Sequence, residues 1–115
     1  MDIIDRGDLE VERQSGRETQ KAVGKGGLVD SQKVLAGFER YSQQDGQTEV
    51  QQVGEELIYV VASTNSWVQY GPNRDQLEAR ISVQPGWLLH AHAGEWVRFG
   101  YDPDGSLDLF VVRLV

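Results

Sequence analysis

Cysteine is absent from this 115-residue sequence, and so is any long run of apolar residues. The lack of cysteine excludes disulfide bonds, thiolate zinc sites and a cysteine nucleophile, and it is typical of a reducing compartment. The N-terminus is polar and has no apolar stretch long enough for a signal peptide or a membrane span. We therefore expect a cytoplasmic protein with no membrane partner.

Basic residues are also scarce. Lysine and arginine together number 11, against 18 aspartates and glutamates, and the formal net charge is −7. No cluster of basic residues stands out along the sequence. Because affinity for nucleic acid depends on the neutralisation of phosphates, the sequence predicts that nucleic acid is not a partner.

The residues that are abundant favour β structure. There are 13 glycines, and β-branched and aromatic residues gather in short blocks separated by turn-forming residues such as those at 44–46 and 102–105. No convincing helical period lies between the blocks. The pattern predicts an all-β domain with strands at residues 34–41, 56–63, 66–70, 77–83, 87–93, 95–101 and 107–115.

The first part of the chain is different. Residues 1–27 are polar, and we expect them to form an N-terminal segment with a short early strand near Leu9 and Val11 and a mobile or loosely attached stretch at 16–27. Residues 28–115 are expected to form a β-barrel.

Two predicted strands carry a clear pattern. Residues 77–83 alternate, which places Leu77, Ala79, Ile81 and Val83 on one apolar face. The C-terminal strand is apolar on both faces, and a small barrel covers only one of them. We therefore predict a homodimer whose interface includes residues 110–115. The competing explanation is that the N-terminal segment covers this face within one chain, through Ile3, Ile4, Leu9 and Val11.

Residues 55–61, followed by residues 85–99, resemble the two conserved motifs of the cupin superfamily, of the RmlC-like kind. The first stretch reads EELIYVV, and the second contains Pro85-Gly86 and Ala93-Gly94 at the spacing of the second cupin motif. The resemblance covers about residues 28–115. It implies a double-stranded β-helix, that is, a jelly-roll barrel of two antiparallel sheets.

The resemblance also implies where a metal would be held, because cupins commonly use two histidines and a glutamate from the first motif and a histidine from the second. Glu56 matches the glutamate, but the upstream window at 49–53 contains no histidine and Val97 stands at the second-motif position. A carboxylate with amides such as Gln51 and Gln52 is too weak a set for a transition metal. We expect no metal cofactor.

His90 and His92, with Glu95, form an alternative set of metal ligands, since two histidines and one carboxylate suffice for a three-ligand site. They do not fit the first motif, because too few residues follow them to form a second motif. The alternation implied by the resemblance turns Leu89 and Ala91 into the lumen and both histidines outward. Two half-exposed strand histidines are therefore the favoured interpretation.

The lumen implied by the resemblance would bind a small molecule between apolar walls, with Gln51, Ile58, Val60, Val97 and Phe99 beside Glu56. A carboxylate in an apolar chamber is a candidate general base, unless an arginine such as Arg40 or Arg98 neutralises it. Two functions remain. One is a sensor or interaction module that binds a small molecule, and the other is a metal-independent enzyme resembling sugar-nucleotide isomerases and epimerases.

Overall fold

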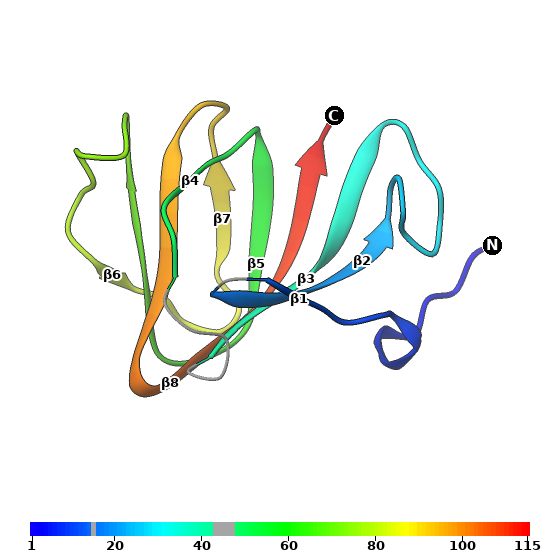
Figure 1. Ribbon diagram of the computed structural model, residues 1–115, viewed down its shortest axis with the longest axis horizontal. Coiled ribbons are helices and arrows are strands. Elements are labelled where there is room, and N and C mark those ends of the chain that lie inside the picture. Colours follow the sequence, from blue (N-terminus) through cyan, green and yellow to red (C-terminus); the bar gives the residue numbers. More distant parts are fainter. Residues whose placement is uncertain (15, 43–47) are drawn as a thin grey trace.

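The computed structural model describes residues 1–14, 16–42 and 48–115, and the turn predicted at 44–46 lies outside this part of the chain. Within it the secondary structure is β, apart from one 3-10 turn, so the all-β prediction is confirmed (Figure 1). No helix in these ranges is long and apolar enough to cross a membrane. The elements are η1 (Arg6–Asp8), β1 (Glu12–Gln14), β2 (Arg17–Val23), β3 (Val34–Ser42), β4 (Gln51–Gln52), β5 (Glu56–Gly71), β6 (Ile81–Ser82), β7 (Leu88–Ala91) and β8 (Trp96–Leu114).

Two long strands, β5 and β8, form the centre of the fold. They pair in antiparallel register from Glu56 opposite Arg113 to Gly71 opposite Trp96. The sequence predicted four separate strands here, because turn-forming residues interrupt both apolar blocks. In the structure each pair of blocks is one strand that bends without ending.

The bend occurs where turn residues had been predicted. The register of β5 against β8 shifts between Thr64 and Ser66, and Asn65 has a φ of 44°. Gly105 lies against this point on β8, where a Cβ atom would come within 2.5 Å of the Asn65 carbonyl oxygen. Gly105 therefore permits the close backbone approach that the bend needs.

The bend folds the two halves of the β5–β8 pair into two layers around one core. Val60 and Leu109 come from the first layer and Val68 and Phe99 from the second, and all four belong to the same buried cluster. Burial of each such side chain is worth about 1.5–3 kcal/mol. The hydrogen-bonded ladder stays continuous through both layers, in the order β1-β2-β3-β8-β5-β6, with β4 paired to β8 and β7 paired to β5.

The N-terminal segment is more ordered than its composition predicted. Residues 17–23 form β2, which pairs with β3 from Glu18 opposite Arg40 onward. Residues 17–23 of the stretch expected to be loosely attached are therefore paired in the sheet, and the boundary expected between residues 27 and 28 lies between β2 and β3. The early strand is β1 at Glu12–Gln14, whereas Leu9 precedes it and is buried.

The predicted strand at 77–83 is also much shorter than expected. Only Ile81–Ser82 forms a strand, β6, which pairs with Trp67 and Val68 on β5. Val83 is buried, but Ala79 and Ile81 are exposed. Of the four residues predicted to share an apolar face, Val83 is the one that belongs to the buried core.

The outer face of the sheet formed by β3, β8, β5 and β7 is apolar and open. Leu57 and Tyr59 on β5 are 42% and 44% exposed, Leu88 on β7 is 64% exposed, and Leu114 on β8 is 54% exposed. Pairing places these strands next to one another, with Tyr59 opposite both Leu88 and Phe110. The two-sided apolar character of the C-terminal strand thus extends across four strands.

The N-terminal segment covers one end of this face. The guanidinium of Arg6 lies 4.1 Å from the centre of the Phe38 ring and 2.7 Å from the Asp108 carboxylate. Ile3 and Val11 remain 86% and 49% exposed. Ile4 is half-buried and Leu9 is buried, whereas Leu57, Tyr59 and Leu88 on β5 and β7 stay exposed.

We propose that a second copy of the chain covers the rest of this face, because an apolar surface of this extent is costly in water and a closed two-fold pair buries it on both copies. Tyr59→Glu should convert a dimer into a monomer, with at least about a hundredfold loss of affinity. Val11→Glu is the control and should stay dimeric. Sedimentation equilibrium at tens of micromolar measures both, and a monomeric wild-type mass would refute the proposal.

Candidate functional site

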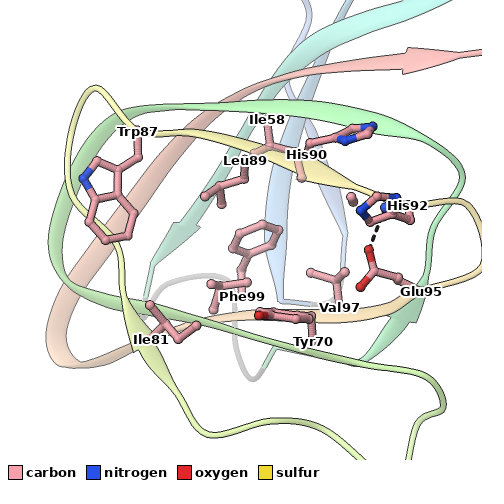
Figure 2. Close-up of a pocket in the computed structure, with 12 residues that line it drawn as sticks. Ile58, Tyr70, Ile81, Trp87, Leu89, His90, His92, Glu95, Val97 and Phe99 are labelled. Carbon is pink, nitrogen blue, oxygen red and sulfur yellow. Dashed lines mark hydrogen bonds between the residues drawn. The ribbon is translucent and has the colours of Figure 1, made fainter.

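A pocket of about 360 Å³ lies between β5, β7 and β8, beside β6 (Figure 2). Three of the predicted lumen residues, Ile58, Val97 and Phe99, line it. Val60 does not, since it is fully buried in the core. We call this the apolar pocket; its wall comprises Ile58, Val68, Tyr70, Ile81, Trp87, Leu89, His90, Ala91, His92, Glu95, Val97 and Phe99.

The apolar pocket has a simple arrangement. Phe99 lies at its centre with Leu89 opposite, and Trp87 closes one end (Figure 2). His92 and Glu95 lie together on the side away from Trp87, while the hydroxyl of Tyr70 points toward Ile81 (Figure 2). A ligand here would meet apolar surface along its length and hydrogen-bonding groups at one end.

Strand β7 turns its side chains as the resemblance implied. Leu89 and Ala91 face inward, whereas His90 and His92 are exposed at the rim of the apolar pocket. The Nε2 atom of His90 lies 2.9 Å from a Glu55 carboxylate oxygen, a partner that the sequence did not indicate. The backbone N–H of His92 donates to Glu95 over 2.6 Å, and this fixes the tight turn after β7.

Glu56 lies outside the apolar pocket. It is 4% exposed, and the Nε atom of Arg113 donates to its carboxylate over 2.6 Å. The sequence suggested Arg40 or Arg98 as the neutralising arginine, and both suggestions are wrong. Arg40 pairs with Glu18, while Arg98 donates to Thr48.

A second arginine comes from the N-terminal segment. The Nη1 atom of Arg17 on β2 lies 2.8 Å from a Glu39 carboxylate oxygen and donates to Gln51 over 3.0 Å and to Tyr41 over 3.4 Å. Arg17, Glu39, Tyr41, Gln51, Glu56 and Arg113 together form what we call the polar cluster. The free space among its residues is about 20 Å³, which is room for about one water molecule.

Burial changes the ionisation of the polar cluster. Burial raises the pKa of Glu39, and the nearby Glu56 carboxylate adds to this, although Arg17 opposes it. Burial likewise raises the pKa of Tyr41 above its ordinary value. Burial lowers the pKa of Arg17, but attraction to Glu39 and contact with Tyr41 outweigh it, so the net pKa is raised and Arg17 stays charged.

The residues at the expected metal positions do not fit a metal. Glu56 is engaged by Arg113, Gln51 accepts from Arg17, and Val97 has no donor atom. Two guanidinium groups therefore lie where a cation would need unshared carboxylate and imidazole ligands. Over residues 1–14, 16–42 and 48–115, no three histidine, cysteine, aspartate or glutamate side chains are placed to hold a metal ion, so His90, His92 and Glu95 do not form such a set.

Val97 and Phe99 line both the apolar pocket and the polar cluster. They therefore form the wall between the two. Glu56 belongs to the polar cluster alone, so its carboxylate does not face a molecule bound in the apolar pocket.

Comparison with solved structures agrees with this architecture. Hydroxypropylphosphonic acid epoxidase from S. wedmorenis superposes with a TM-score of 0.73 at 10% identity, over 99% of this chain and 59% of the epoxidase. Ethanolamine utilization protein Q from Salmonella typhimurium gives 0.68 at 15% identity, over 97% of this chain and 84% of that protein. These are cupin-fold proteins. This chain has the cupin fold.

A further cupin-fold neighbour is the polyketide cyclase RemF from Streptomyces resistomycificus, with a TM-score of 0.67 at 16% identity, over 97% of this chain and 78% of the cyclase. This chain spans about 59% of the length of the epoxidase. No family model and no curated protein sequence matches the chain.

The raised pKa of Glu39 leads to a pH-dependent stability. The folded state binds a proton on Glu39 more tightly than the unfolded state does. Protonated Glu39 therefore stabilises the fold below the pKa that Glu39 has in the unfolded chain. This stabilisation is lost as pH rises through the pKa of Glu39 in the folded state. Glu39→Gln cannot ionise there. Its free energy of unfolding should therefore rise relative to wild type as pH is increased above about 4.3, the ordinary pKa of a glutamate.

Urea unfolding at several pH values in this range measures the difference. Glu78→Gln, at an exposed position, is the control and should give a difference that varies far less with pH. A Glu39→Gln difference that falls as pH rises would contradict the assignment.

The arginine contacts also predict what would restore a metal site. Gln51 and Val97 are directly opposed on β4 and β8, and both line the polar cluster with Glu56. Gln51→His with Val97→His and Arg113→Met should bind zinc, because the third change frees Glu56 as the third ligand. The double variant that keeps Arg113 should bind zinc at least about tenfold more weakly. Calorimetric zinc titration tests this, and a folded triple variant without zinc affinity would show that the three positions do not converge.

Proposed function

We propose that this cupin barrel binds a small, largely apolar molecule in the apolar pocket and acts as a binding or sensor module. The observation that carries the proposal is the pocket itself, with its volume of about 360 Å³ and walls of aliphatic and aromatic side chains. Pockets of this size and lining are typical of small-molecule sites. The side chains of Ile58, Val97 and Phe99 line this cavity without filling it.

The wall of the pocket supports a planar ligand. Phe99 and Trp87 offer aromatic surface, and Leu89 lies opposite Phe99 (Figure 2). Aromatic rings favour stacked or edge-on contact with another ring. His92 and Glu95 provide polar groups at the end away from Trp87. An aromatic compound with a polar group at one end fits both features.

The alternative, a metal-independent isomerase or epimerase that uses Glu56 as a base, has less support. A general base must come within hydrogen-bond reach of the proton that it removes. Glu56 is 4% exposed, is paired with Arg113, and is separated from the apolar pocket by Val97 and Phe99. Its geometry is that of a structural ion pair.

Filling the apolar pocket tests the binding proposal. Leu89→Trp should place an indole in the free space and weaken binding of the neutral probe N-phenyl-1-naphthylamine by about tenfold or more. Leu88→Trp, at the adjacent position on the outer face, is the matched control and should bind as wild type. Fluorescence titration measures both. Equal binding by wild type and Leu89→Trp would refute a site in the apolar pocket.

A further inference from the structure

A second cavity lies on the inner face of β2, β3 and β8, away from the apolar pocket. It has a volume of about 360 Å³, and its lining includes Arg17, Lys21, Lys25 and Arg113 but only one acidic residue, Glu39. We call this cavity the basic concavity. A chain with 11 basic and 18 acidic residues thus gathers four of its basic side chains around one cavity.

The two arginines of the basic concavity are held in ion pairs, whereas its two lysines, within the described part of the chain, are not. Glu39 pairs with Arg17 at 2.8 Å, and Glu56, from the polar cluster, pairs with Arg113 at 2.6 Å. Among the described residues neither Lys21 nor Lys25 forms an ion pair, although Lys21 also borders a hollow lined by Asp8, Glu10 and Glu12. Both lysines are exposed, so they can turn toward a ligand at little cost.

The remainder of the basic concavity is suited to an organic ligand. Val23, Leu35 and Val111 supply apolar surface beside the cations. Thr19 also lines the cavity, and its hydroxyl has no hydrogen-bond partner within the described part of the chain. Rotation of this side chain about one bond would present a donor to an anionic group.

The geometry points to a binding site for a small organic anion, with its carboxylate or phosphate between Lys21, Lys25 and Arg113 and its apolar body on Leu35 and Val111. Arginine and lysine at the edge of an apolar cavity are the groups that recognise such anions. The site is independent of the apolar pocket, since the two cavities share no residue. The chain would therefore have two separate small-molecule sites, one for a largely apolar ligand and one for an organic anion.

Two related probes separate the sites. The anion 1-anilinonaphthalene-8-sulfonate and the neutral N-phenyl-1-naphthylamine share their aromatic rings and differ in the sulfonate. Lys21→Gln with Lys25→Gln should weaken binding of the anionic probe by about fivefold or more, because two charges leave the cavity. The same variant should bind the neutral probe as wild type does.

The control removes the same charge elsewhere. Lys33→Gln with Arg74→Gln changes the net charge equally at exposed positions outside the basic concavity. It should bind the anionic probe as wild type does. Equal weakening by both double variants would mean that only overall charge matters, and an unaffected Lys21/Lys25 variant would mean that the probe binds elsewhere. Either result overturns the proposal.

Competition identifies the anionic group. Displacement of the anionic probe by benzoate would assign a carboxylate ligand, and displacement by phenyl phosphate a phosphate ligand, while displacement by neither would overturn the site. Leu89→Trp should retain binding of the anionic probe at the basic concavity. The experiment therefore distinguishes a failure of the binding proposal for the apolar pocket from a failure of the proposal for the basic concavity.

Discussion

The pairing of β5 with β8 is the constraint on which the rest of the structure depends. These two strands run antiparallel over almost their whole length and bend together near Asn65 and Gly105. The bend places both layers around one core, and β3, β4, β6 and β7 each add to one of these two strands. Because both cavities and the polar cluster are lined by β5, β8 or both, the geometry of every candidate site follows from this one pairing.

The polar cluster shows how a barrel of this fold satisfies buried charge with side chains alone. Glu39 and Glu56 would be costly to bury as isolated carboxylates. Arg17 and Arg113 offset that cost, and Arg17 also donates to Gln51 and Tyr41. The cluster leaves room for about one water molecule, so it is a packed polar core. The apolar pocket shares Val97 and Phe99 with it, and the basic concavity shares Arg17, Glu39 and Arg113.

Much of the fold and part of the site could be predicted from local pattern. The alternation implied by the cupin resemblance expected Leu89 and Ala91 inside and both histidines outside, and in the structure the histidines are exposed at the rim of the apolar pocket. Ile58, expected from alternation, and Val97 and Phe99, expected from the resemblance, line that pocket. The pairing of residues 17–23 with β3 was not predicted, because the polar composition of residues 16–27 indicated loose attachment. The strand pairs with β3 through backbone groups, which any composition provides.

The β class and the approximate strand positions followed from the local pattern of the sequence. Only the tertiary structure decided which arginine meets which carboxylate and where basic residues gather. Arg113 is 57 residues from Glu56, and Arg17 is 34 residues from Gln51. Alternation fixes which face a side chain occupies within its own strand. The contacts between strands far apart in the chain depend on the register of β2, β3 and β8, which is set by packing over the whole barrel.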